Sequence, residues 1–187
     1  MVGILTEGGA SVHLDLAKDV LIPIAIGVLS SFLFILLLSR LRPSIDISRE
    51  IAKMPVGGCG PSAGGYAIKV VNKSKRAAIE IRARLALAVP AVVPGGIITA
   101  TTDYVLEKDS LFELPGQGKE AEDSAFRFIT YQNIEADWLP GRAYIQFSLV
   151  AKDSLSGFGR AITKKYEVKS DKLRDGVFEV GNSMRIV

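Results

Sequence analysis

The amino-acid sequence predicts one N-terminal transmembrane α-helix followed by an all-β domain. The first observation is the stretch Val20–Ser39, which holds no charged residue over 20 positions. As a helix it would span about 30 Å, the thickness of a bilayer's hydrocarbon layer. The second is that, from Ser44 onward, apolar and polar residues alternate in short runs separated by turn-forming residues. This pattern is typical of a β-sandwich or barrel, and the length favours the sandwich.

Length and charge divide the chain of 187 residues into three parts. Residues 1–19 form a short acidic tail, residues 20–42 the transmembrane helix and residues 44–187 the β-sandwich domain. The third part is long enough to bury a core without disulfides or metal ions. Residues 40–187 carry an excess of five positive charges, which is too dilute for nucleic-acid binding. We therefore expect no nucleic acid among the partners.

The apolar stretch is predicted to be a retained anchor. A secretory signal peptide would begin with basic residues and end at a cleavage site with small side chains, but here Glu7 precedes the stretch and Arg40 and Arg42 follow it. The alternative is the core helix of a soluble protein. Core helices are seldom apolar on every face, and the β domain has no obvious place for one. We expect Arg40 and Arg42 to lie among the lipid headgroups.

The positive-inside rule predicts the orientation of this anchor. Lys18 is the one basic residue before it, whereas four follow soon after: Arg40, Arg42, Arg49 and Lys53. The β domain is therefore expected on the cytoplasmic side of the inner (plasma) membrane, with the N-terminus outside. The single cysteine, Cys59, agrees with a reducing compartment. The tripeptide Asn72-Lys73-Ser74, an N-glycosylation pattern, argues the other way and would be inert in the cytoplasm.

Within the anchor, Gly27 and Ser31 are four residues apart. Small residues at this spacing allow two helices to approach closely in lipid. The alternative is that glycine and serine are simply tolerated in a spanning helix. Self-association of the chain through this face is therefore one of two interpretations.

The first half of the domain shows clear twofold periodicity. We expect strands at Ser44–Ser48 and Tyr66–Asn72, separated by an irregular loop at Pro55–Gly65. A longer strand is expected at Ala77–Val89, whose apolar face alternates with a charged face. The Pro- and Gly-rich segment Pro90–Gly96 is expected to end it.

The second half is predicted to continue with short strands and turns. The expected strands are Ile97–Leu106, Leu111–Leu114, Ser124–Thr130, Arg142–Lys152, Arg160–Lys169, Val177–Val180 and Met184–Val187. The segment Tyr131–Gly141 is expected to be a long turn, with Trp138 and Leu139 tucked under the sheet. The loop Asp153–Gly159 would join the two strands of a hairpin.

Two strand pairs carry a resemblance to a known class of domain. Tyr66–Asn72, the polar turn after it and Ala78–Arg82 resemble a strand pair common in immunoglobulin-like bacterial domains. The hairpin Arg142–Lys169 is similar to the last large hairpin of such sandwiches. More broadly, the chain resembles uncharacterised prokaryotic single-pass membrane proteins with a cytoplasmic immunoglobulin-like domain. The resemblance implies an immunoglobulin-like β-sandwich of about eight or nine strands. It carries over no functional residue, and the Cys–Trp–Cys arrangement of true immunoglobulin domains is absent.

The residues needed for common catalytic and metal sites are scarce. The only histidine, His13, lies in the tail, and Cys59 is the only cysteine. This argues against Ser–His–Asp and Cys–His nucleophiles and against zinc. The glycine-rich loop 57–65 lacks the ending of a phosphate-binding loop, a lysine followed by serine or threonine, and a strand rather than a helix is expected after it. The acids Glu120, Glu122 and Asp123 could bind calcium, but a solvated loop is the simpler reading. We expect no catalytic residue, cofactor or metal.

Two surface features are candidates for binding. Lys73, Lys75 and Arg76 form a basic turn that either faces anionic headgroups or is an ordinary charged surface. Leu155 and Phe158 lie in the hairpin loop. Exposed apolar residues on a loop can mark a binding edge, although Phe158 could instead fold back over the hairpin.

These observations predict a non-enzymatic, membrane-anchored module that holds a binding or sensory domain at the cytoplasmic membrane face. Its expected partners are the lipid bilayer, a protein and, through the helix, further copies of itself. The alternative is a membrane-acting effector of a defence or toxin-like system, whose transmembrane helices oligomerise under control of the β domain. An enzyme with an unrecognised site is the third hypothesis, and the scarcity of histidine disfavours it.

Overall fold

The computed structural model describes residues 8–40, 42–55, 64–118, 124–139, 141–167 and 169–187. The chain divides into two compact units, Met1–Arg40 and Leu41–Val187. Each unit is described by itself. Cys59, most of the glycine-rich loop and the acids at 120–123 lie outside the described residues, as does the side chain of His13.

The first unit is the helix α1, Gly8–Ser39. It begins at Gly8 rather than at Val20, so part of the acidic tail is helical. Within it, Lys18–Leu38 is long and apolar enough to cross a membrane, and the large apolar side chains from Val20 to Leu37 are exposed. The prediction of an N-terminal apolar helix followed by a β domain is confirmed.

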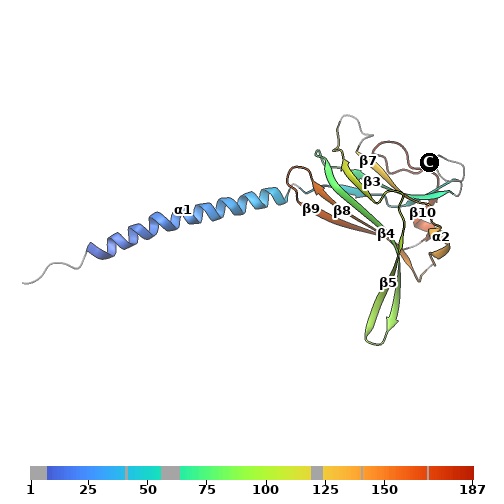
Figure 1. Ribbon diagram of the computed structural model, residues 1–187, viewed down its shortest axis with the longest axis horizontal. Helices are drawn as coiled ribbons and strands as arrows, with labels where there is room; N and C mark the ends of the chain where they lie inside the picture. The colour runs from blue at the N-terminus through green and yellow to red at the C-terminus, as the bar shows by residue number, and fades with distance from the viewer. Residues whose placement is uncertain (1–7, 41, 56–63, 119–123, 140, 168) are drawn as a thin grey trace, which may run out of the picture. The chain divides into compact units, whose positions relative to one another are not determined.

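The second unit contains two five-stranded sheets, seen in Figure 1. The first sheet has the order β1-β3-β2-β10, with β7 paired to β3. Its strands are β1 (Ile45–Ile47), β2 (Ile51–Met54), β3 (Gly65–Asn72), β7 (Ala125–Thr130) and β10 (Leu173–Asp175). Its pairs are antiparallel except β2–β10, which is parallel.

The second sheet has the order β5-β4-β8-β9, with β6 paired to β4. Its strands are β4 (Ala78–Val93), β5 (Gly96–Tyr104), β6 (Ser110–Leu114), β8 (Tyr144–Asp153) and β9 (Gly159–Tyr166). All its pairs are antiparallel. Because β8 contributes Ile145, Phe147 and Leu149 to the core at alternate positions, its predicted apolar face is confirmed.

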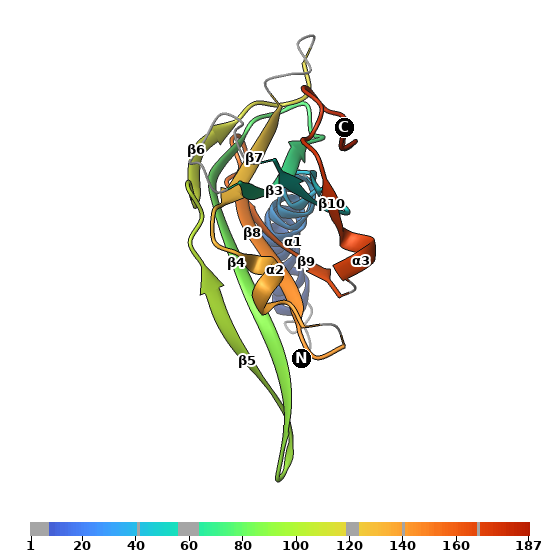
Figure 2. The same cartoon turned by 90° about the vertical axis from the view of Figure 1, so that its right-hand side faces the viewer.

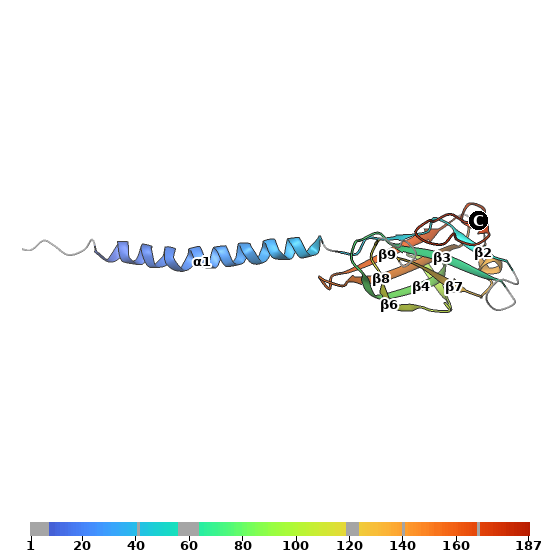
Figure 3. The same cartoon turned by 90° about the horizontal axis from the view of Figure 1, so that it is seen from above.

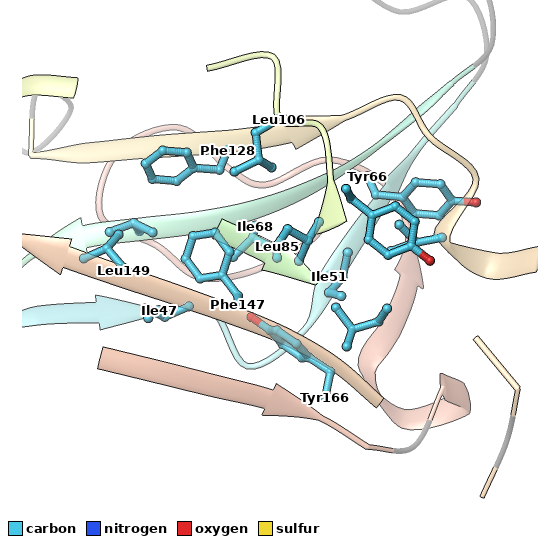
Figure 4. Close-up of a cluster of buried hydrophobic side chains, with 14 of the residues drawn as sticks. Ile47, Ile51, Tyr66, Ile68, Leu85, Leu106, Phe128, Phe147, Leu149 and Tyr166 are labelled. Atoms are coloured by element: carbon cyan, nitrogen blue, oxygen red, sulfur yellow. The ribbon is translucent and has the colours of Figure 1, made fainter. Parts of the chain in front are cut away.

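The two sheets share one hydrophobic core, shown in Figure 4. Phe128 of β7 and Phe147 of β8 meet between the sheets, with ring centroids 5.6 Å apart. The buried Tyr166 hydroxyl, from β9, donates to the carbonyl of Ser48, just before β2, at 2.9 Å. Face-to-face packing of two sheets is the arrangement of a β-sandwich.

The strand β3 is buried on both faces. Tyr66, Ile68 and Val70 lie in the shared core, as the periodicity predicts. The opposite face is covered by residues 176–187, here called the C-terminal segment, whose Phe178 packs against Ala67. The C-terminal end of the chain lies beside β2 in Figure 3. This third layer explains why β3 does not alternate between buried and exposed residues.

The strand β4 does not end at Pro90, which corrects the prediction of a break there. It continues to Val93 and returns as β5, with Pro90 opposite Thr99. A proline is tolerated because β8 pairs with β4 only as far as Ala88, so Pro90 has no strand on its other side. The resulting β4–β5 arm, defined as Val89–Ala100, projects from the body of the domain in Figures 1 and 2.

Four short elements were not anticipated. They are β2, β10 and the one-turn helices α2 (Ile134–Asp137) and α3 (Lys169–Lys172). Conversely, the strands expected at Val177–Val180 and Met184–Val187 form only a single bridge, between Phe178 and Ile186. Three backbone hydrogen bonds join the two halves of this segment, and side chains of β3 and β7 donate to its carbonyls.

Candidate binding cavity

A cavity of about 600 Å³ opens where β2, α2, α3 and β10 come together. It is lined by Lys53, Glu135, Gly141, Glu167, Lys169, Ser170, Leu173 and Asp175. The volume falls within the range of small-ligand and peptide side-chain sites, about 300–1,000 Å³. It is therefore the leading candidate for a binding site among the described residues.

The helix α2 is fixed tightly and so positions Glu135 at this cavity. Asn133 caps the helix, because its Oδ1 accepts from the Ala136 backbone N–H at 3.2 Å. The same Oδ1 accepts from the Tyr66 hydroxyl at 3.1 Å. Ile134 is completely buried in the core. The cap and the buried Ile134 hold α2 in place, and the next residue, Glu135, lines the cavity.

Two lysines converge on Glu135 from different elements. The Lys53 Nζ donates to the Glu135 Oε2 at 2.7 Å. The Lys169 Nζ donates to the Glu135 backbone carbonyl at 2.8 Å and lies 3.5 Å from Oε1. The hydrogen bond from Lys53 lowers the pKa of Glu135, and the same pair raises the pKa of Lys53. Lys53 and Glu135 are therefore both charged at neutral pH.

This arrangement is suited to binding rather than to proton transfer. A lysine whose pKa is raised and a glutamate whose pKa is lowered are poor acid–base catalysts near pH 7. The exposed carboxylates Glu167 and Asp175 and the half-buried Leu173 complete the lining. The cavity thus offers an apolar contact beside two carboxylates that form no ion pair with any residue that the structure describes. This combination fits a basic and partly apolar segment.

A smaller cavity of about 390 Å³ adjoins the first. It shares Gly141 and Glu167 with the larger one and is otherwise lined by Val89, Pro90, Arg142, Ala143 and Tyr144. Tyr144 lies under the Lys165 ammonium group, 4.9 Å from the ring centroid. The concave surface therefore continues from β10 to the base of the β4–β5 arm.

The loop predicted as a binding edge lies elsewhere, beside the basic turn. Leu155 is 70 % exposed, whereas Phe158 is half-buried. The buried Asp153 carboxylate accepts from the Ser156 N–H at 2.9 Å, the Leu155 N–H at 3.0 Å and the Arg76 Nε at 3.0 Å. Burial would raise the pKa of Asp153, but these donors outweigh it and hold the pKa below its ordinary value. Asp153 therefore holds the loop through these hydrogen bonds. A binding role for Leu155 stays a prediction.

The basic turn is fixed by Asn72, a fully buried side chain. The Asn72 Nδ2 donates to the carbonyls of Arg76, Leu114 and Pro115 at 2.9–3.1 Å. A buried amide with these partners cannot accept a glycan in the folded protein. In the folded domain, Asn72 therefore serves to hold the turn.

Gly27 and Ser31 lie one turn apart on α1. Gly27 has open space where a side chain would be, and the Ser31 hydroxyl donates to the Gly27 carbonyl at 2.8 Å within the helix. Packing between copies through these residues stays a prediction. Arg40 and Arg42 are both exposed.

Comparison with known proteins assigns no family. No family model matches the sequence, and no curated protein matches it. Among solved structures, the fold is similar to the sporulation control protein Spo0M from Bacillus subtilis, with a TM-score of 0.37 and 11 % identity. The match covers 68 % of this chain and 49 % of that one, so it spans about half of Spo0M. A likeness this distant supports no functional argument.

Sequence reasoning did not find the cavity residues. The sequence Asn133-Ile-Glu-Ala carries the signal of a capped helix, because asparagine is a preferred N-cap residue. That signal would have placed Glu135 on a fixed element. The sequence near Glu135 does not predict its hydrogen bond with Lys53, because the two residues are 82 positions apart.

Proposed function

We propose that the protein is a non-enzymatic, single-pass membrane module that holds a binding domain at the cytoplasmic face of the cell membrane. The cavity around Glu135 would take a segment of a partner protein. The observation that supports this proposal is the cavity itself. In it, Lys53 and Lys169 both bind Glu135, and Leu173 and two further carboxylates lie beside them.

The chemistry of the lining suggests which segment would bind. Leu173 and Asp175 lie on β10, an edge strand that has β2 on one side and no partner on the other among the described residues. Edge strands accept extended peptides by backbone pairing, with side-chain sites giving selectivity. An apolar residue would contact Leu173, and a basic residue would meet Asp175 or Glu167. The proposed ligand is therefore an extended segment with apolar and basic residues.

The proposed membrane anchor is supported by the apolar stretch and by the basic residues that follow it. The apolar stretch Lys18–Leu38 is long enough to cross the bilayer. Arg40 and Arg42 follow it, which favours a cytoplasmic domain by the positive-inside rule. We further propose that the sandwich belongs to the immunoglobulin-like class. Two mostly antiparallel sheets, packed around one core that contains aromatic side chains, support this proposal.

Photo-crosslinking in intact cells tests the binding site. A photoreactive phenylalanine analogue is placed at Leu173 in the full-length chain, and at Leu155 in a matched control. We expect a protein adduct from position 173 and its loss when Glu135→Lys is added, because three cations would then face one another. Adducts from position 155 alone, or adducts from 173 that survive Glu135→Lys, would overturn the proposal.

A further inference from the structure

The two edges of the second sheet differ in charge. The edge strand β9 carries Arg160, Lys164 and Lys165, and charged residues on an edge discourage pairing with another strand. The opposite edge strand, β5, has no charged residue before Asp103. Asp103 is itself paired with Arg84 of β4, with the Arg84 Nη2 at 2.8 Å. One edge is thus protected, and the other is open.

The open edge belongs to the β4–β5 arm, which is apolar and uncovered. Val92 is 86 % exposed, Ile97 73 % and Ile98 55 %. All residues of β5 from Gly96 to Asp103 are exposed, so neither face of the strand is packed against the domain. A long, uncharged and exposed edge strand normally pairs or aggregates unless something covers it.

The backbone groups along the outer edge of β5 favour another β-strand as the partner that covers this edge. The outer N–H and C=O groups of β5 have no strand partner among the described residues, and lipid cannot supply hydrogen bonds to them. A pairing strand must also lack charge where it meets Ile97–Thr102, since an unpaired charge would be partly desolvated there. The strand β5 meets this requirement itself. Antiparallel pairing of two β5 strands brings no uncompensated like charges together, because each Asp103 already has Arg84.

We propose that β5 of one chain pairs antiparallel with β5 of a second copy across a twofold axis. A twofold interface needs one self-complementary patch, and an uncharged edge supplies it. Two nine-residue strands bury less than the roughly 800 Å² per partner of a standard interface. Association is therefore weak in solution and becomes substantial for copies confined to one membrane, where their effective concentration is high. This surface is separate from the cavity on β10.

Cysteine cross-linking of the full-length chain in membranes tests the pairing. In a Cys59→Ser background, single substitutions Thr99→Cys, Ala100→Cys and Thr101→Cys scan the register of β5. Thr163→Cys, an exposed threonine on β9, is the matched control. We expect a disulfide-linked dimer from at least one β5 position and none from position 163. Equal cross-linking from both edges, or none from β5, would overturn the proposal.

A second measurement separates the arm from the anchor as the source of dimers. Fluorescence energy transfer between labelled copies in lipid vesicles reports association of the full chain. The double variant Thr99→Lys/Thr101→Lys is expected to weaken association about tenfold or more, while Thr163→Lys leaves it unchanged. The arm projects from the core, so circular dichroism should not change. If the lysine variant associates normally and Gly27→Leu abolishes association, the helix rather than β5 makes the dimer, and the proposal is wrong.

Discussion

Replacing Lys69 by methionine should release the C-terminal segment without unfolding the sandwich. Lys69 is 1 % exposed, and its Nζ donates to the backbone carbonyls of Glu179 at 2.6 Å and Ser183 at 2.7 Å. Burial, with Arg127 nearby, lowers the pKa of Lys69. Methionine keeps the apolar stem but leaves both carbonyls without this donor.

The expected loss follows from the two hydrogen bonds and the charge removed. Each bond to a charged donor contributes about 1.5–3 kcal/mol, and removing the desolvation of a partly buried charge returns part of this. We expect a net loss of roughly 2 kcal/mol in the local stability of the C-terminal segment. Amide exchange there would accelerate by about thirtyfold, since 1.4 kcal/mol corresponds to a factor of ten.

Hydrogen exchange measured by mass spectrometry resolves this effect by region. The peptide covering 176–187 should exchange faster in Lys69→Met, because the amides of Val177 and Val187 are bonded within that segment. A peptide from β8 should be unchanged, as should the exposed-lysine control Lys73→Met. Unchanged protection of the C-terminal segment would refute the anchoring role of Lys69. Equal acceleration in β8 would show that Lys69 supports the whole core instead.

Three further predictions concern Asp153, Trp138 and Gly116. The pKa of Asp153 lies below its ordinary value of 3.8, so its contribution to stability is complete above that value and is lost as the pH falls through the lower, folded-state pKa; urea unfolding below about pH 4 should show this loss, and Asp153→Asn should remove it. The buried indole N–H of Trp138 has no hydrogen-bond partner in the described parts of the chain; Trp138→Phe should therefore destabilise the domain far less than Trp138→Ala, for which thermal unfolding should indicate about 3–5 kcal/mol. A methyl group on Gly116 would collide with the Lys75 carbonyl; Gly116→Ala should lower the unfolding midpoint clearly, while Gly118→Ala, with open surroundings, should leave it unchanged.

The sequence predicts those parts of the fold whose signals are local. Apolar residues recur at every second position, at Tyr66, Ile68 and Val70 in one strand and at Ile145, Phe147 and Leu149 in another, and the structure contains both strands as β3 and β8. The strands β2 and β10 have four and three residues and pair in parallel across more than a hundred positions, so no periodicity identifies them. Trp138 is buried as predicted, but its neighbour Leu139 is exposed, because the α2 turn directs the two side chains differently.

The strand around Pro90 and the cavity around Glu135 could not be predicted from the sequence for the same reason. Both depend on which residues lie nearby in the folded structure. Pro90 normally interrupts a strand, yet it is compatible with one where the adjacent edge is vacant. Glu135 becomes a feature of a cavity only when Lys53 on β2 and Lys169 on α3 approach it from distant parts of the chain. The charge contrast between β5 and β9 is visible in the sequence, but only the strand order identifies both as edges.

The most direct test of membrane anchoring with a cytoplasmic domain is cysteine accessibility in cells. In full-length Cys59→Ser protein, Ser154→Cys places one thiol on an exposed loop of the domain. A membrane-impermeant maleimide should leave this thiol unlabelled in intact cells and label it after lysis, and the protein should stay in the membrane fraction at alkaline pH. Labelling in intact cells, or release at alkaline pH, would contradict the account.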